Sequence, residues 1–291
     1  MTADQLLAGW TPRRVGRRIV VLAETESTNT LALAAADEPD ADGLVILADA
    51  QTAGRGRLGA TWLSPRGASV LCSVVLLEEK GDAALFKEGE KKGSGTFFRD
   101  GPGSAAQKRS LPPFSLSAWL TQVSAVAVCE AICQATDVTP AIKWPNDLRI
   151  VGRKVGGILI ETRLVDDRMR AWVVGVGINC LQQAGHFPPE LSESATSLEL
   201  ATHHPVDRVA VARELFKALD RRLALELWGQ TEQVHRDWLA YAEPIGQKVR
   251  LRRDGRDYAG WTVEVDPAGG LIVKLETGQQ EWFDPMRTKL L

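Results

Sequence analysis

A loop rich in glycine and arginine, GRGRLGATW, occupies residues 54–62. Glycines let backbone amides come close to a phosphate, and the guanidinium groups of Arg55 and Arg57 bring positive charge to it. The loop lacks the GKS or GKT of a Walker motif, and no helical pattern follows it as in a dinucleotide-binding fingerprint. Taken alone, the segment fits an anion-binding loop and a flexible surface loop about equally well.

A second segment, KWPNDLRI, spans residues 143–150. Pro145 disfavours a helical conformation at the residue before it, so we expect a strand that runs into a turn. Lys143, Asn146 and Asp147 supply a cation, an amide and a carboxylate, which suit a nucleotide, its ribose and a metal-bridged phosphate. Because Asn-Asp pairs also form ordinary turns, this simpler interpretation stays open.

Two further segments contain glycines within strand-like runs, GRKVGGILIET at residues 152–162 and GVGINC at 175–180. Lys154 precedes a Gly-Gly pair, so its side chain lies at a strand start where the backbone can approach a ligand. By itself, it is better explained as an exposed lysine of a hairpin. Asn179 ends an apolar strand, where it either caps the strand end or contacts a ligand.

The elements that carry these segments are predicted from their patterns. Runs of apolar and β-branched residues predict strands, at residues 44–48 and 69–77 and in four pieces between 141 and 180. Helical patterns occur in four places: from Ser27 or Thr28, over 115–136, from Val206 to Trp228 and from Val234 to Tyr241. The Val151-Gly152 pair resembles a hairpin turn, which implies antiparallel pairing. We therefore predict an α+β fold with a mixed, largely antiparallel sheet.

The pattern changes after Glu243, where short strands alternate with turn signals. About five strands in so short a segment predict a small β-barrel. We expect a catalytic domain at residues 1–242 and a small β-domain at 243–291. Residues 78–113 are rich in glycine, lysine, glutamate and serine, so we predict a flexible insertion there.

Composition limits the classes of function. A net charge of −2 over 291 residues argues against a general electrostatic grip on nucleic acid or on an anionic membrane. We find no apolar run near the roughly 20 residues that span a bilayer and no signal peptide, and therefore expect a cytoplasmic protein without a membrane partner. The four cysteines, which lack C-x-x-C spacing, are expected to be small buried hydrophobic residues.

Taken together, these segments resemble the biotin protein ligase family, which includes biotin–[acetyl-CoA-carboxylase] ligases and holocarboxylase synthetases. The matching motifs occur in family order: STN, QTAGRGRLGATWLSP, KWPNDL, RKVGGILIE, VGVGIN and ATSL. The resemblance implies a class II synthetase-like catalytic domain and a C-terminal SH3-like barrel. It also implies an ATP-dependent ligase that forms biotinyl-5'-AMP and transfers biotin to a lysine of a biotin carboxyl carrier domain.

The resemblance also implies a role for individual residues. Positions that match the family's biotin-binding residues are Ser27, Thr28, Asn29, Gln51, Gly54, Arg55, Gly56, Arg57, Lys154 and Gly157. Positions that match its ATP-binding residues are Arg57, Trp62, Lys143, Asn146, Asp147 and Asn179. Arg57, Lys154 and Mg²⁺ would neutralise the charge that develops as the biotin carboxylate attacks the α-phosphate. The ligands of the metal are not assigned, and no nucleophile of the enzyme is required.

The chain departs from the family pattern at Ala60, where a basic residue that contacts the triphosphate is common. Arg66 is a candidate replacement. Only about twenty-five residues precede the resemblance, too few for a helix-turn-helix, so we expect no DNA binding; a homodimer is possible. Two alternatives stay open: a lipoate or octanoate ligase, and a non-catalytic biotin-binding sensor.

Overall fold

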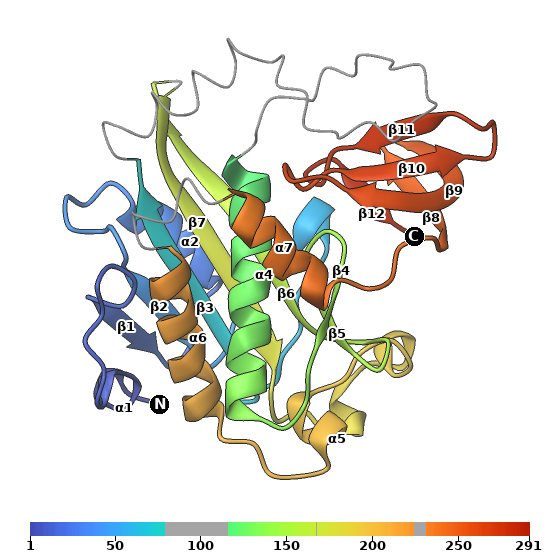
Figure 1. Cartoon of the computed structure of the whole chain (residues 1–291). Helices are drawn as coiled ribbons and strands as arrows, with labels where there is room; N and C mark the ends of the chain where they lie inside the picture. Colours follow the sequence, from blue (N-terminus) through green and yellow to red (C-terminus); the bar gives the residue numbers. More distant parts are fainter. Residues whose placement is uncertain (79–115, 167, 224–230) are drawn as a thin grey trace.

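A seven-stranded sheet forms the first part of the protein in this computed structural model, which describes residues 1–78, 116–166, 168–223 and 231–291 (Figure 1). The strand order is β1-β2-β3-β7-β6-β5-β4. Their bounds are β1 (Ile19–Leu22), β2 (Val45–Ala48), β3 (Ser69–Leu77), β4 (Ala141–Lys143), β5 (Asp147–Ile150), β6 (Arg153–Val165) and β7 (Arg168–Asn179). Only the β1–β2 pair is parallel within this described sheet, which confirms the predicted α+β class. The predicted insertion at 78–113 lies outside the described residues except for Glu78.

Helices cover both faces of this sheet. Figure 1 shows α4 (Leu116–Ala135), α6 (Arg208–Arg222) and α7 (Thr231–Tyr241) in front of the strands and α2 (Thr28–Ala35) behind them. Alternate strand residues follow this division: on β7, Trp172 and Val174 belong to the core under α4, whereas Ala171 and Val173 pack with α2. The expected helix start at Ser27 or Thr28 is confirmed, with Ser27 as the N-cap residue. Short helices α1 (Ala3–Leu7) and α5 (Leu198–Thr202) complete this part.

Helix α4 corrects one expectation. By length and composition its 20 residues could cross a membrane, with a mean hydropathy of 1.5 in the most apolar window, so an apolar run of spanning length does exist. However, 83% of that window is buried inside the fold. Its Trp119, for example, is fully buried. The helix is apolar all round because it packs against the sheet on one side and against α6 and α7 on the other.

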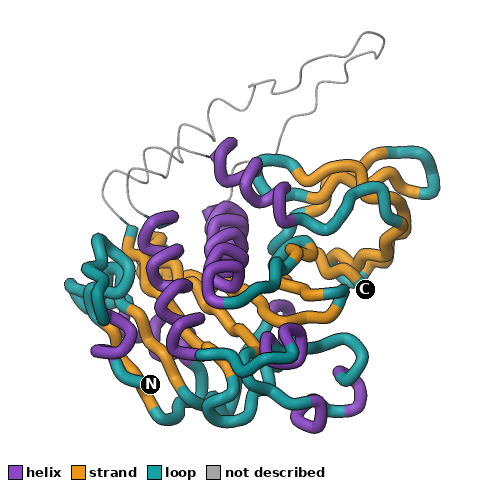
Figure 2. Tube along the Cα trace, turned by 60° about the horizontal axis from the view of Figure 1, so that its bottom comes forward, coloured by secondary structure: helices purple, strands orange, loops and turns teal. Residues whose placement is uncertain are grey.

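In Figures 1 and 2 the C-terminal β-domain lies to one side of the main sheet. It is a separate antiparallel sheet of five strands, in the order β11-β10-β9-β8-β12. Its strands are β8 (Lys248–Arg253), β9 (Arg256–Val265), β10 (Leu271–Leu275), β11 (Gln280–Phe283) and β12 (Thr288–Leu290). The first hairpin turns at Asp254 and Gly255, both with positive φ, as a tight hairpin requires. One contact between this domain and the main sheet is a hydrogen bond from the Trp144 indole N–H to the Gly269 carbonyl at 2.8 Å. The proposed boundary at Glu243 stays a prediction.

The hairpin between β5 and β6 aligns the strands that carry the candidate site. Val151 and Gly152 have φ values of 48° and 74°, which confirms the predicted tight turn. The resulting register pairs Asp147 with Gly157, and Gly157 with Gly177 of β7. Residues from distant motifs therefore lie side by side on one face of the sheet.

A buried carboxylate that the sequence analysis did not single out holds the N-terminal segment. Asp220 of α6 is 4% exposed and accepts the backbone N–H groups of Arg13, Arg14 and Val15 at 2.9, 2.7 and 2.9 Å. Hydrogen bonds to a charged acceptor are stronger than neutral ones, and a buried N–H without a partner is costly. This carboxylate therefore fixes the path of the chain that enters β1.

We expect Asp220→Ala to lower the free energy of unfolding by about 3 kcal/mol, because three backbone donors lose a charged acceptor. Urea denaturation of wild type and variant measures the difference. Glu190→Ala, which removes an exposed carboxylate, is the control and should stay within about 0.5 kcal/mol of wild type. Equal stability of the two variants would show that the N-terminal segment is held by other contacts.

Candidate active site

A row of paired residues crosses the sheet from β3 to β4 and forms the floor of the site. Strand register places these residues in sequence across the sheet: Leu71, Gly177, Gly157, Asp147 and Lys143. The row begins with an apolar side chain, continues through positions without a side chain and ends with a carboxylate and an ammonium group. A ligand with an apolar end and an anionic end therefore fits along it.

A cavity of about 180 Å³ lies over this row, on the face of the sheet that α2 covers. It brings together most of the residues predicted from the sequence: Ser27, Thr28, Asn29, Gln51, Arg55, Gly56, Arg57, Trp62, Lys143, Asn146, Asp147, Lys154 and Gly157. Segments more than a hundred residues apart in the chain thus line one cavity. Their individual roles toward a ligand stay predictions.

Two predicted residues are not among those that line the cavity. Gly54 supports the cavity lining without being part of it, because its carbonyl accepts the backbone N–H of Trp62 at 2.9 Å. Asn179 is 5% exposed, and its amide donates to the Thr196 carbonyl at 3.0 Å and accepts from Gln182 at 2.8 Å. In this structure Asn179 therefore fixes the end of β7, which is one of the two roles expected of it, and its role toward ATP stays a prediction.

The segment 54–62, which we call the Gly-Arg loop, folds over the cavity as a short hairpin. The Gly56 N–H donates to the Ala60 carbonyl at 2.7 Å, and Leu58 and Gly59 turn the chain with φ values of 52° and 79°. Trp62 then lays its ring against β7. A β-carbon at Gly177 would lie 2.7 Å from that ring, so only glycine permits this approach. The Trp62 indole N–H is buried and has no hydrogen-bond partner in the described part of the chain.

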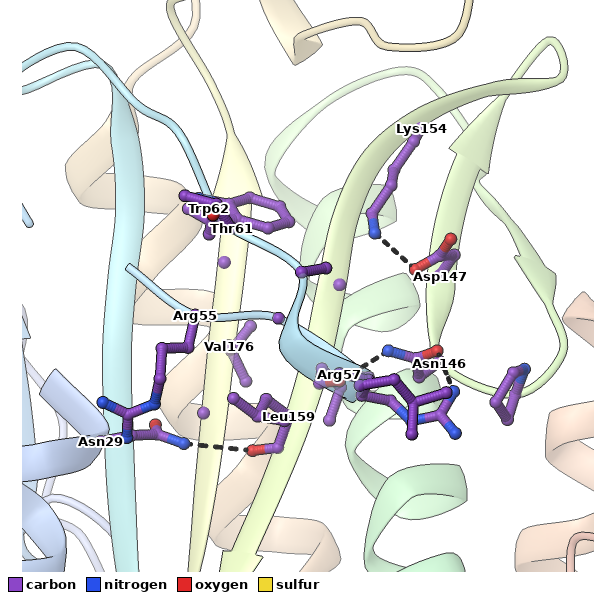
Figure 3. A pocket seen from close by; sticks show the side chains of 18 of the residues that line it. Asn29, Arg55, Arg57, Thr61, Trp62, Asn146, Asp147, Lys154, Leu159 and Val176 are labelled. Carbon is purple, nitrogen blue, oxygen red and sulfur yellow. Dashed lines mark hydrogen bonds and ion pairs between the residues drawn. The ribbon is translucent and has the colours of Figure 1, made fainter. Parts of the chain in front are cut away.

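Arg57 points from the loop toward Asn146 (Figure 3). Its guanidinium donates to Asn146 Oδ1 at 3.0 Å, to the Thr288 carbonyl at 3.3 Å and to the Pro285 carbonyl. Burial lowers the pKa of Arg57, although an arginine stays protonated at neutral pH. All three acceptors are neutral. A phosphate would therefore give Arg57 a charged partner that it does not have here.

Lysines and one carboxylate form the far end of the site. Lys154 Nζ lies 2.6 Å from Asp147 Oδ1 and 5.5 Å from the centre of the Trp62 ring (Figure 3). Burial, followed by the positive charge of Arg149, lowers the pKa of Lys143. An anion bound beside Lys143 would offset both effects.

Several residues of the site were missed from the sequence. Ser73 and Glu161 extend the polar network behind the cavity, and Lys289 and Leu290 of the C-terminal β-domain complete its wall. An isolated serine inside the apolar strand SVLCSVVLL is a signal that could have been used, because a buried hydroxyl needs a partner. Nothing in the sequence near Lys289 marks it as part of the site.

The departure at Ala60 lies at the cavity, since Ala60 is one of the lining residues. Arg66 does not take its place. It donates to the Ala23 carbonyl at 2.8 Å and pairs with Glu24 outside the cavity. The cavity lining contains two further cations besides Arg55, Arg57 and Lys154, namely Lys143 and Lys289.

Asp147 is the one carboxylate among the residues that line the cavity. No group of three or more His, Cys, Asp or Glu residues could hold a metal ion within the described ranges. These residues do not build an all-protein cage. They fit a magnesium ion held by one carboxylate and by substrate phosphates, which is a common arrangement for this metal.

Comparison with known proteins agrees with this geometry. The model of the biotin/lipoate A/B protein ligase family matches residues 21–86 and 105–179. The biotin–[acetyl-CoA-carboxylase] ligase of Mycobacterium tuberculosis is 32% identical over 279 residues, covering 93% of this chain and 87% of that protein. The corresponding ligase of Paracoccus denitrificans is 30% identical over 266 residues, covering 89% and 95%.

A solved structure shows the same fold. Biotin protein ligase from Aquifex aeolicus, in complex with biotin and ATP, superposes with a TM-score of 0.71 at 24% identity, over 94% of this chain and 99% of that one. A mixed, largely antiparallel sheet with helices on both faces, a cavity over two of its glycines and an appended β-domain define the class. The chain belongs to the biotin/lipoate A/B protein ligase family, and its relatives place it among the biotin protein ligases.

Lys143→Met should leave the unliganded protein as stable as wild type or slightly more stable at neutral pH. The lowered pKa means that folding disfavours the charged form, so removing the charge removes a penalty. We expect a gain of no more than about 1 kcal/mol, because solvent screens a partly buried group. The gain should vanish as the pH rises through the folded and then the unfolded pKa of lysine, where wild type also becomes neutral. Urea denaturation at neutral and alkaline pH measures it.

Lys274→Met is the control for this prediction, since Lys274 lies exposed on β10. Its unfolding free energy at neutral pH should stay within about 0.5 kcal/mol of that of wild type. A clear loss of stability in Lys143→Met at neutral pH would contradict the conclusion that burial disfavours the charged form of Lys143.

Proposed function

We propose that this protein activates biotin with ATP to form biotinyl-5'-AMP and then transfers biotin to a lysine of a biotin carboxyl carrier domain. The observation that carries the proposal is the row across the sheet, which leads from Leu71 through two glycines to Asp147 and Lys143. Membership of the family and the identity to biotin–[acetyl-CoA-carboxylase] ligases support it.

The proposed orientation of the substrates follows from the chemistry of the lining. The bicyclic end of biotin lies at Thr28 and Gln51, and its carboxylate lies near Lys154. A carboxylate oxygen attacks the α-phosphorus of ATP, and the bond to the leaving pyrophosphate breaks. Arg57 and Lys154 stabilise the negative charge that develops, in a site closed by the Gly-Arg loop.

The second half of the reaction needs no covalent enzyme intermediate. The amine of the carrier lysine attacks the acyl carbon of the mixed anhydride, and AMP leaves with the bonding electrons. Cys72 is the one cysteine among the lining residues, and burial raises the pKa of its thiol to about 12. At neutral pH this thiol is protonated and unreactive, which agrees with direct transfer to the carrier.

A magnesium ion is part of the proposal. Asp147 and Asn146 would hold it together with phosphate oxygens, and the ion would supply charge to polarise the phosphate. Lys154 Nζ lies 2.6 Å from one oxygen of Asp147. Lys289 and Leu290 bring the C-terminal β-domain to the wall of the cavity, and we propose that this domain assists nucleotide or carrier handling. We place the reaction in the cytoplasm; the absence of DNA binding and a homodimer stay predictions.

The test is incubation of the purified protein with ATP, Mg²⁺, biotin and an isolated biotin carboxyl carrier domain, followed by a streptavidin blot. Parallel reactions with lipoate or octanoate and a lipoyl domain address the nearest alternative. Labelling that depends on ATP and biotin supports the proposal. Biotin binding without labelling would identify a sensor, and lipoylation would identify the other branch of the family.

Arg57→Ala should reduce the rate of adenylate formation by a factor on the order of 10² or more, as for loss of one preorganised charge contact. Pyrophosphate release at saturating ATP and biotin measures this rate. Arg66→Ala is the matched control, because Arg66 follows the Gly-Arg loop closely but lies outside the cavity. Near-normal pyrophosphate release by Arg57→Ala would refute the assignment.

Gly177→Ala should impair binding without unfolding the protein. The new methyl group would displace the Trp62 ring, which lies at the cavity and can move into it. We expect at least about a tenfold weaker affinity for biotin and ATP together, with little change in melting temperature. Titration calorimetry and thermal unfolding give the two values. Gly185→Ala, where a β-carbon would meet nothing within 4 Å, should match wild type in both.

A further inference from the structure

A second cavity, of about 520 Å³, lies between the main sheet and the C-terminal β-domain (Figure 1). One wall consists of β4, the end of α7 and the segment that follows it, and the other consists of strands β8, β9, β10 and β12. The volume is within the range of roughly 300 to 1,000 Å³ that is typical of small-molecule sites. We call this space the junction cavity.

Most residues that line the junction cavity are apolar. Ile245 and Leu291 are 53% and 48% exposed there, although both are large apolar side chains. Buried side chains from both parts of the fold lie in the same lining: Ile142, Trp144, Trp238, Val265 and Leu271. Apolar surface of this kind favours an apolar group that leaves water. An aliphatic chain therefore fits the junction cavity.

The same lining carries more positive than negative charge. Glu243 is the one carboxylate side chain in it, and the cations are Lys143, Arg149, Lys248 and Arg250. Lys248 pairs with Glu276 at 3.0 Å, whereas Arg250 is exposed and has no ion pair among the residues that the structure describes. Because opposite charges attract, an anionic group is favoured at this cavity.

Arg149 has unused hydrogen-bonding capacity for such an anion. Its Nη1 lies 3.5 Å from Glu243 Oε1, which is longer than an ordinary hydrogen bond. Its Nε is buried and has no hydrogen-bond partner within the described ranges. A guanidinium binds a carboxylate most strongly through two parallel N–H groups. Arg149 is therefore well suited to hold the carboxylate of a ligand.

The junction cavity shares part of its wall with the cavity of the active site. Lys143, Trp144 and Leu290 line both cavities, whereas Arg149 lines only the junction cavity. Burial, followed by the positive charge of Arg149, lowers the pKa of Lys143, so these two cations influence each other. An anion at Arg149 and a phosphate in the active site would compete for Lys143 and repel each other across this wall.

We propose that the junction cavity binds an aliphatic carboxylate, with its chain among the apolar residues and its head group at Arg149, and that this ligand weakens the binding of ATP. The coupling is reciprocal, so ATP weakens the binding of the carboxylate by the same factor. The effect on ATP rests on the proposed function, but the carboxylate site does not.

Calorimetric titration of the full-length protein with decanoate tests the site. We expect one decanoate per chain. Decanol has the chain without the charge, and acetate has the charge without the chain, so each should bind at least about tenfold more weakly. Equal binding of decanol, or several decanoate ions per chain, would indicate nonspecific adsorption and refute the proposal.

Two variants locate the head group. Arg149→Met removes the guanidinium and should weaken decanoate binding about tenfold or more. Ile245→Asp places a negative charge at an exposed position of the lining and should also weaken binding. If Arg149→Met proves unfolded by thermal denaturation, Ile245→Asp carries the comparison. Affinity equal to that of wild type in the folded variants would rule out this site.

A matched arginine outside both cavities serves as the control. Arg163 pairs with Asp37 at 2.8 Å on β6 and lines neither the active-site cavity nor the junction cavity. Arg163→Met removes the same charge as Arg149→Met and should bind decanoate like wild type. An equal loss of affinity in the two variants would mean that net charge, and not the junction cavity, governs binding.

Biotin and decanoate are both carboxylates with an apolar part, so the two cavities must be told apart. Saturating biotin should leave decanoate affinity within about twofold, because the two ligands occupy different cavities. The indole N–H resonance of Trp238, assigned with Trp238→Phe, gives a location that needs no biotin. Trp238 lines only the junction cavity, and decanoate should shift its signal. Displacement by biotin, or an unchanged Trp238 signal, would overturn the proposal.

Steady-state pyrophosphate release tests the effect on ATP. Saturating decanoate should raise KM for ATP about fivefold or more, while kcat at saturating ATP stays within about twofold. The response should be lost in Arg149→Met and kept in Arg163→Met. A constant KM for ATP would refute the coupling. If decanoate bound at Arg149 but the protein never turned over biotin, the proposed function would fail and the carboxylate site would stand.

Discussion

The close approach of side chains to bare backbone on β7 is the constraint on which the site depends. Gly177 leaves the space that the Trp62 ring fills, and Gly175 leaves the space for the Asn29 amide. Both glycines face α2, because alternate residues of a strand share a face. With a side chain at either position, the Trp62 ring or the Asn29 amide would be pushed away from the strand. The shape of the floor of the site thus depends on the absence of side chains at Gly175 and Gly177.

The cations along this floor differ in whether a carboxylate neutralises them. Arg55 is neutralised by Glu161, and Lys154 by Asp147, whereas Arg57 has only neutral acceptors and burial lowers the pKa of Lys143. A polyanionic ligand therefore gains most at the end of the row nearest the C-terminal β-domain. Local arrangement, not the net charge of −2, gives the protein its affinity for phosphate.

Much of this architecture could be predicted because its signals are local. The Val151-Gly152 turn, the strand 69–77 and the buried helix before residue 136 follow from residue type and spacing. The contacts of Asp220 with the N-terminal segment could not be predicted, since they join residues about two hundred positions apart. The site shows the same division. Motifs marked most lining residues, but Asn179 turned inward to Thr196 and Gln182, and Glu161 was hidden within an otherwise ordinary strand.

Arg57 donates hydrogen bonds to the C-terminal β-domain, and the nature of these acceptors affects which sequence changes the contact tolerates. Its acceptors at residues 285 and 288 are main-chain carbonyls, which every amino acid carries. Substitutions at these two positions can therefore accumulate without removing the contact, and an alignment would show no invariant residue there. An insertion or deletion between β11 and β12 would shift the carbonyls and lose it. Selection for this contact should therefore act on the length of the segment, not on the identity of the side chains at its two acceptor positions.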